Sequence, residues 1–180
     1  MSWYIVRSFI SLLIIFFIQV NVANAALVRN ELYFKGNLVN QPCKISQGFD
    51  SLEVSLGEIH TKTLYENGRS EDFPFGIELS QCQKSGIYNS IKVTFTGVED
   101  EKLRGHLKVN GEASGVAIAI ANEDKTLLPL GTASSAVSIE NGTIMLKFFA
   151  YIDVQKQAKI DKSIHAGDYS ATANFLISYQ

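Results

Sequence analysis

The sequence predicts an all-β protein, and three observations support that prediction. Beyond the first 25 residues, apolar side chains recur with a period of two far more often than with the helical period of about 3.6. Gly, Asn and Asp interrupt this pattern about every ten residues, as turns do between short strands. Two cysteines, Cys43 and Cys82, are available to form one bridge. These features are typical of a sheet protein with tight turns.

The first segment of the chain has the pattern of an export signal. Arg7 lies in a short N-terminal region, an apolar run follows in residues 9–20, and Ala23-Asn24-Ala25 forms an A-x-A cleavage site. A membrane anchor is the alternative, but the run of about 12 residues is shorter than the roughly 20 that span a bilayer. We therefore expect residues 1–25 to be a signal peptide that is removed after Ala25.

The remaining residues, 26–180, carry little net charge. Arg7 is the only charged residue lost with the signal, so 15 of the 16 Lys and Arg remain against 18 Asp and Glu. A chain of this size can bury a sizeable core as one domain. Its weak acidity gives no electrostatic reason to expect nucleic acid or an anionic membrane as a partner.

Export places Cys43 and Cys82 in an oxidising compartment, where two thiols normally pair. We therefore expect a disulfide. A metal site or a reactive thiol is the alternative, but each needs ligands or a base nearby, and no His lies within fifteen residues of either cysteine. His60, His106 and His165 lie far apart in the sequence and are expected at the surface or in loops, not as metal ligands.

The sequence contains no phosphate-binding loop, nucleophile elbow or zinc-protease motif. We therefore predict no catalytic, cofactor-binding or metal-binding residues and no cofactor. Asn141-Gly142-Thr143 matches a glycosylation sequon, but Asn-Gly has a sufficient structural reason in a turn.

Eight strands are predicted in the order of the chain. An Asn-Gly pair between two apolar runs is a strong hairpin signal, and it joins the sixth of these strands to the seventh. Residues 155–167 read as a loop, with a helical turn or two in residues 154–164 as the alternative. Eight short strands and one disulfide in a single domain suggest an immunoglobulin-like sandwich. The strands are residues 32–45, 52–56, 73–80, 87–97, 116–122, 136–140, 143–154 and 169–179.

The chain after the signal begins with a strictly alternating segment. One face is mostly apolar and the other is charged or polar, so the segment could be an edge strand of the domain's own sheet. It begins, however, almost at the new N-terminus, and Gly36 lies on its apolar face, where glycine often marks close backbone approach. A spare strand that pairs with another molecule is the alternative. The apolar face consists of Val28, Asn30, Leu32, Phe34, Gly36 and Leu38.

The C-terminal segment alternates in the same way. A sandwich of the immunoglobulin type normally needs a further strand to cover such a final strand, so we expect the domain to be one strand short. An open edge with apolar pockets invites pairing with another strand. The core-facing positions are predicted to be Tyr169, Ala171, Ala173, Phe175, Ile177 and Tyr179, and the chain ends at Gln180.

Five segments of the sequence are similar to segments of one known family. FKGNLVNQPC at residues 34–43 and GDYSATANFLISYQ at residues 167–180 lie near the two ends of the chain after the signal. PFGIELSQC at 74–82, VTFTG at 93–97 and GVAIAIANEDKTLLPLG at 115–131 lie between them. Together these segments resemble type 1 fimbrial subunits, which are pilins of the chaperone–usher class, over the whole chain after the signal.

The resemblance implies an incomplete immunoglobulin-like β-sandwich that lacks its final strand and is completed by a donor strand from another chain. The partners it implies are neighbouring pilin subunits, a periplasmic chaperone that lends a strand, and an outer-membrane usher where the strands are exchanged. It divides the chain into a signal peptide (1–25), a donor-strand extension (26–36) and a pilin domain (37–180). The protein would pass through the periplasm to the cell-surface fimbrium and support cell adhesion.

The resemblance also assigns roles to residues. Cys43 and Cys82 would form the family's disulfide, and the carboxylate of Gln180 would be anchored by basic residues of the chaperone. Asn30 departs from the pattern because an apolar donor residue is expected there. The donor positions would be Val28, Asn30, Leu32, Phe34, Gly36 and Leu38, and the C-terminal groove and chaperone-facing strand would consist of Tyr169, Ala171, Ala173, Phe175, Ile177, Tyr179 and Gln180.

Two other classes of function compete with the structural subunit. The first is a monomeric secreted sandwich that binds a carbohydrate or protein ligand through its loops, but the loops carry no cluster of Trp or Tyr, and Trp3 lies in the signal. An enzyme is the second, and it would need a site that the sequence does not indicate. Within the pilin class, the sequence leaves shaft subunit, adaptor and chain terminator open.

Overall fold

The computed structural model describes Lys35 and residues 41–180, apart from residues 50 and 85. The chain divides into two units, residues 1–38 and 39–180, and the sheets belong to the second unit. The six predicted donor positions lie outside the described residues: Val28, Asn30, Leu32, Phe34, Gly36 and Leu38. Within the part of the chain that the structure describes, no helix is long and apolar enough to cross a membrane.

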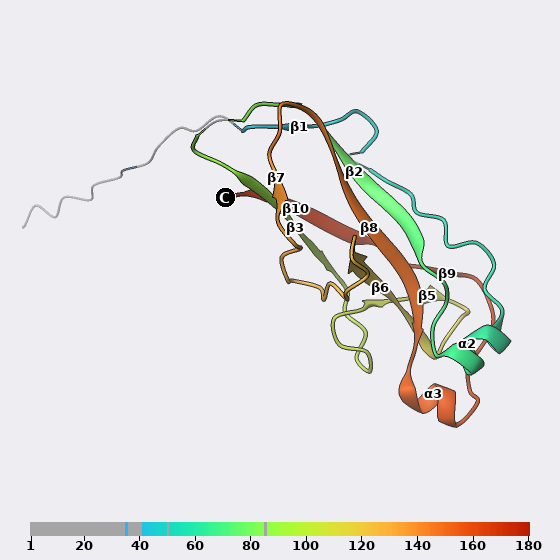
Figure 1. The fold of residues 1–180 in the computed structure, drawn as a ribbon. Helices are drawn as coiled ribbons and strands as arrows, with labels where there is room; N and C mark the ends of the chain where they lie inside the picture. The colour runs from blue at the N-terminus through green and yellow to red at the C-terminus, as the bar shows by residue number, and fades with distance from the viewer. Residues whose placement is uncertain (1–34, 36–40, 50, 85) are drawn as a thin grey trace, which may run out of the picture. The chain divides into compact units, whose positions relative to one another are not determined.

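Residues 41–180 form two antiparallel sheets and one short strand pair (Figure 1). The five-stranded sheet has the order β1 (Lys44–Ile45), β2 (Phe73–Cys82), β8 (Gly142–Val154), β6 (Val116–Asn122) and β4 (Leu107–Lys108). The three-stranded sheet has the order β10 (Ala173–Tyr179), β3 (Ser90–Gly97) and β7 (Val137–Ser138). β5 (Asn110–Gly111) pairs with β9 (Tyr169–Ser170). The predicted all-β sandwich is confirmed.

The core lies between the two sheets, where alternate side chains of facing strands meet. Ile77 and Leu79 of β2 and Ile91 and Val93 of β3 are at most 1% exposed. Two short helices, α2 (Thr61–Asn67) and α3 (Lys156–Ile160), lie at one end of this unit, and the C-terminus lies near the other (Figure 1). The last strand, β10, therefore runs toward the end of the domain that is remote from the helices.

The expected disulfide between Cys43 and Cys82 is present. It connects the segment just before β1 to the last residue of β2. Next to it, the backbone N–H of Gln83 donates to the carbonyl of Pro42 at 2.8 Å. The point where the chain enters the sandwich is therefore fixed both covalently and by a hydrogen bond.

The hairpin predicted between residues 136–140 and 143–154 is wrong. β7 pairs with β3, whereas β8 pairs with β2 and β6, so the two strands belong to different sheets. Asn141 and Gly142 are still required at this turn. Gly142 has a φ of 104°, and the side-chain oxygen of Asn141 accepts the backbone N–H of Lys84 at 2.8 Å. Asn-Gly here carries the chain across the sandwich instead of folding it back on itself.

Other segments also differ from the prediction. Residues 52–56 form no strand, although Leu56 is buried and Val54 packs against the core. Helix α2 is not among the predicted elements. It is capped by Gly68, whose φ is 81° and whose backbone N–H donates to the carbonyl of Leu64 at 2.9 Å. The Asn67-Gly68 pair therefore ends a helix. The helical alternative in residues 154–164 is confirmed by α3.

The predicted C-terminal strand needs correction, and one loop histidine is buried. The strand predicted over residues 169–179 is interrupted at Ala171 and Thr172, which separate β9 from β10. His106 lies in the loop before β4, but its side chain is buried at 5% exposure, unlike the exposed His60 and His165.

Candidate functional site: an apolar groove beside an open strand edge

Strand β10 is the edge of the three-stranded sheet. It pairs with β3 on one side, and among the described residues no strand pairs with its other side. Its side chains alternate as the sequence predicted: Ala173, Phe175 and Ile177 pack against the core, while Asn174 and Leu176 are exposed. The core-facing side chains are only half-buried, which is unusual for apolar residues that face a core.

The pairing of β10 with β3 shows where the remaining backbone groups point. Ser90 and Gln180 exchange both of their backbone hydrogen bonds, at 2.9 Å each. In an antiparallel ladder such pairs alternate with pairs that do not hydrogen-bond. By this alternation, residues 174, 176 and 178 also bond to β3. The N–H and C=O groups of residues 173, 175, 177 and 179 therefore point toward the open edge.

An apolar groove of about 550 Å³ lies beside this edge. Residues 171–175 form one rim, and the segment from Ile45 to Leu56 forms the other. Side chains of β2, β3, β4, β6 and β8 form the floor, and every residue of the lining is uncharged. The groove thus offers an apolar channel together with a row of backbone donors and acceptors. Its floor consists of Phe75, Ile77, Phe95, Leu107, Ile118, Ile120 and Ala150.

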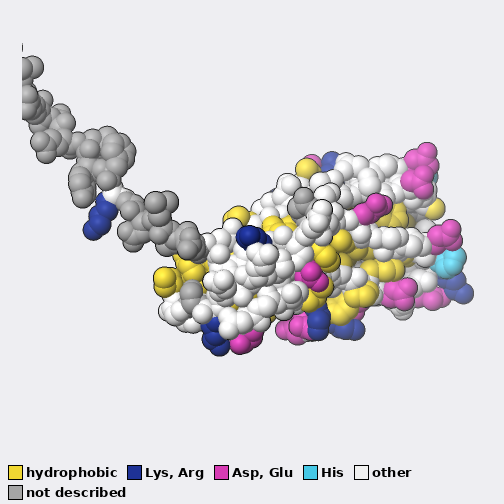
Figure 2. Space-filling view, turned by 90° about the horizontal axis from the view of Figure 1, so that it is seen from above, with side chains coloured by type: hydrophobic (Ala, Val, Ile, Leu, Met, Phe, Trp, Pro, Cys, Tyr) yellow, Lys and Arg dark blue, Asp and Glu magenta, His cyan; other side chains and the backbone are white. Residues whose placement is uncertain are grey.

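Aromatic rings form the centre of the floor. Phe75 and Phe95 lie 6.0 Å apart between ring centroids, and Phe148 packs beneath them at 5.6 Å and 5.0 Å. Phe95 and Phe148 are buried, whereas Phe75 is half-buried at the groove. In Figure 2, hydrophobic side chains reach the surface over the body of the domain, and charged side chains lie mostly around their margins.

The C-terminal end of β10 is tied to the loop before β3. One oxygen of Gln180 accepts the backbone N–H groups of Asn89 and Ser90 at 2.6 and 2.9 Å. Tyr179 packs against Tyr88 with ring centroids 6.1 Å apart, and its hydroxyl donates to the carbonyl of Cys43 at 3.4 Å. The terminus is thus held by backbone donors while the Gln180 side chain is exposed.

Tyr169 differs from the other core-facing residues of the C-terminal segment. It lies in β9, outside β10, and its phenol oxygen is buried with no hydrogen-bond partner among the described residues. Burial raises the pKa of this phenol above its usual value of 10.0. Tyr169 does not line the groove, whereas Ala171, Ala173 and Phe175 do.

The sequence located one rim of the groove but missed the other parts. The sequence predicts strands that contain Phe75 and Phe95 of the floor, but it gives these residues no functional role. It also predicts strand for most of the rim residues between Ile45 and Leu56, again without assigning them to a groove. The signal that could have found this rim is its apolar alternation, Leu52, Val54 and Leu56, directly after the disulfide.

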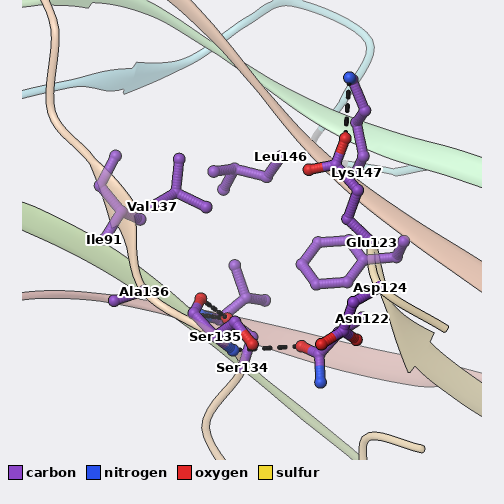
Figure 3. A pocket seen from close by; sticks show the side chains of 12 residues that line it. Ile91, Asn122, Glu123, Asp124, Ser134, Ser135, Ala136, Val137, Leu146 and Lys147 are labelled. Atoms are coloured by element: carbon purple, nitrogen blue, oxygen red, sulfur yellow. Dashed lines mark hydrogen bonds and ion pairs between the residues drawn. The ribbon is translucent and has the colours of Figure 1, made fainter. Parts of the chain in front are cut away.

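A second hollow, of about 330 Å³, lies beside β7 (Figure 3). Its polar side chains bond to one another or to nearby backbone: the Asn122 side-chain oxygen accepts the N–H of Ser135 at 3.1 Å, and Lys147 pairs with Glu123 at 2.9 Å. Ser134 accepts the N–H of Val93 at 2.9 Å. The contact between Ser134 and Val93 fixes the segment just before β7 over β3, and these polar groups of the hollow are already partnered within the domain.

The family model described as "Fimbrial protein" matches residues 32–180. The chain belongs to the fimbrial protein family. Two relatives in this family are each 33% identical to the chain: the major MR/P fimbria protein of Proteus mirabilis, over 88% of this chain and 91% of the relative, and the fimbrial adapter PapK of Escherichia coli, over 85% and 89%. The chain is therefore a structural subunit of a fimbria.

Solved structures agree with this fold. A structure described as a chaperone–usher pilus is 25% identical, covers 84% of this chain and 96% of its own, and has a TM-score of 0.67. The P pilus rod subunit PapA has the same TM-score at 24% identity, covering 78% of this chain and all of its own. The fimbrial subunit thus shares the sandwich of known pilins over most of its length.

Proposed function

We propose that this fimbrial subunit polymerises by donor-strand exchange: the N-terminal extension of one copy lies in the groove of another and pairs with β10. The observation that carries the proposal is the open edge of β10 beside the apolar groove. An extended peptide that adds a strand to an exposed edge gains main-chain hydrogen bonds, and pockets for alternate side chains give it specificity.

The extension has the pattern that this groove requires. In the sequence, Leu32, Phe34 and Leu38 fall on one face of residues 26–38, at the spacing of alternate side chains in a strand. Burying these three side chains would contribute roughly 5–9 kcal/mol. The uncharged lining favours such side chains over a charged ligand. Val28, Asn30 and Gly36 complete the proposed donor face.

The open groove is also the reason to propose a chaperone and an usher as partners. A domain with an exposed apolar groove and an open edge is prone to aggregation, so we assign it a periplasmic chaperone that covers the groove until a neighbour replaces it at an outer-membrane usher. The proposed route begins with removal of residues 1–25 and ends at the cell surface. Basic chaperone residues would bind the carboxylate of Gln180, which lies at the end of β10.

The proposal is tested by deleting residues 26–33, which removes Val28, Asn30 and Leu32 of the donor face. We expect both the full and the shortened chain to be recovered with the chaperone, and only the full chain to form multimers that survive electrophoresis without boiling. The matched control is the double substitution Arg29→Ala and Glu31→Ala, which keeps the length and changes the other face. Multimers are expected from that variant as from the unaltered chain.

A monomeric sandwich that binds a ligand through its loops is the competing function. It predicts a chain that folds without a chaperone and behaves identically with and without residues 26–33. That result would overturn donor-strand exchange and favour a ligand-binding site in the loops.

A further inference from the structure

We propose that consecutive copies also contact each other directly, through Val98 of the accepting copy and Ile87 of the inserted copy. The inference rests on the proposed donor-strand exchange and adds a second joint to it. Both side chains are apolar and strongly exposed in the subunit, at 67% for Val98 and 72% for Ile87. They lie at opposite ends of the domain, Val98 after the last residue of β3 and Ile87 before its first.

The direction of insertion decides which ends meet. Every strand pair in the described domain is antiparallel, and antiparallel pairing is slightly more stable per residue than parallel pairing. A donor strand antiparallel to β10 runs from the Tyr179 end toward the Ala173 end. Its last groove-facing residue, Leu38, therefore leaves the groove beside Ala173.

Val98 lies at this exit. It follows Gly97, the partner of Ala173 in the β3–β10 pair. Its carbonyl accepts the backbone N–H of Lys108 at 2.8 Å, which fixes the backbone at the end of β3. Its side chain is thus held at the surface where the inserted chain emerges.

Ile87 lies at the other end, next to the start of the domain. Its loop, residues 83–89, is tied to Pro42 through the N–H of Gln83 at 2.8 Å, and to Gln180 through the N–H of Asn89 at 2.6 Å. Pro42 precedes the disulfide-bonded Cys43, which is 1% exposed. In an inserted copy, Ile87 therefore stays close to the point where the extension joins the domain.

The length of chain between the two copies brings these ends together. From Leu38, in the groove of one copy, to Cys43, fixed in its own domain, there are five Cα–Cα steps. Such a segment spans at most about 18 Å when fully extended. The inserted domain therefore abuts the exit of the groove. Among the strongly exposed large apolar residues that the structure describes, Val98 directly follows the partner of Ala173 at this exit, and Ile87 lies at the end where the extension joins the domain.

The experiment uses the full chain with Val98→Cys and Ile87→Cys, treated with a short bis-maleimide after assembly. Only the introduced thiols react, because Cys43 and Cys82 are bonded to each other. The matched control carries Leu176→Cys and Ile87→Cys, since Leu176 is also 67% exposed but lies in the middle of β10 on its outer face. Multimers are scored separately, without boiling and without cross-linker.

We expect at least a tenfold larger fraction of dimers and longer ladders after boiling for the Val98–Ile87 variant than for the Leu176–Ile87 control. The contact is overturned if multimers form but the Val98–Ile87 variant is not cross-linked, or if the Leu176–Ile87 control is cross-linked equally. Either result leaves donor-strand exchange supported. If neither variant nor the unaltered chain forms multimers, donor-strand exchange fails and the contact fails with it.

Discussion

His106 is a buried histidine whose two ring nitrogens both have acceptors. Nδ1 lies 3.0 Å from the carbonyl oxygen of Arg104 and Nε2 lies 3.2 Å from Oδ2 of Asp153. A carbonyl and an ionised carboxylate only accept hydrogen bonds, so both contacts are hydrogen bonds only when both ring nitrogens carry a proton, which favours the imidazolium form. Burial alone lowers the pKa of His106, but the Asp153 and Arg104 bonds, aided by the charge of Asp100, outweigh it and raise the pKa above 6.5.

The raised pKa predicts that His106 stabilises the subunit more at acidic than at alkaline pH. A folded-state pKa above the unfolded value gives stability that is fully present below the unfolded pKa, about 6.5, and is lost as pH rises through the folded pKa. Replacing His106 with Gln should therefore cost about 1.5–3 kcal/mol at about pH 5.5, on the scale of charged hydrogen bonds, and clearly less at about pH 8. Urea unfolding at both pH values, followed by circular dichroism, measures this difference.

The control for His106 is His165→Gln, because His165 is exposed. That variant should unfold like the unaltered chain at both pH values. A loss for His106→Gln of the same size at both pH values would show that the ring acts through packing and not through its charge.

At the scale of elements, the long alternating strands were predictable and the short ones were not. β6 coincides with the predicted strand 116–122, and β8 differs from its prediction by one residue. β5 and β9 each have two residues and depend on a tertiary contact: a Cβ at Gly111 would overlap the backbone of Asp168. No local sequence pattern indicates such a contact.

Strand β10 was predictable in pattern but not in extent. Its interruption at Ala171-Thr172 coincides with close approach to Gly97, where an added Cβ would lie 2.8 Å from the carbonyl oxygen of Thr172. The alternation of the last strand was enough to predict the open edge. The second rim was missed because residues 51–56 line the groove without forming a strand ladder.

The alternation of backbone groups in β10 predicts opposite effects of proline at neighbouring positions. Ala173→Pro removes an N–H that points to the open edge, and proline is tolerated on edges in this position. The subunit should still fold, but an inserted strand should bind more weakly by about 0.5–1.5 kcal/mol, the net value of one hydrogen bond. The readout is the temperature at which multimers dissociate in detergent.

Asn174→Pro is the matched substitution, because the N–H of Asn174 points to β3. It should destabilise the subunit itself and lower its recovery with the chaperone. Equal effects of the two prolines on folding would contradict the assignment of the odd-numbered residues to the open edge.

In the whole molecule, the disulfide fixes the point where the proposed donor extension joins the domain. Cys43 lies where the extension joins the domain, Cys82 ends β2, and the carbonyl of Cys43 accepts the hydroxyl of Tyr179 at the end of β10. The disulfide therefore fixes the point where the extension joins the domain to the end of β2, and the hydrogen bond from Tyr179 connects the same point to the end of β10.

Reduction of this bond should weaken the whole subunit. Removing a native disulfide from a small secreted domain typically costs about 2–5 kcal/mol, so the urea midpoint of the reduced chain should fall by that equivalent. The control is the double variant Cys43→Ser and Cys82→Ser, which should unfold like the reduced chain and should not respond to reductant. If the oxidised and reduced chains unfold at the same urea concentration, the bond is not a stabilising link, and the hydrogen bond between Gln83 and Pro42 with the packing around it must fix the root of the extension.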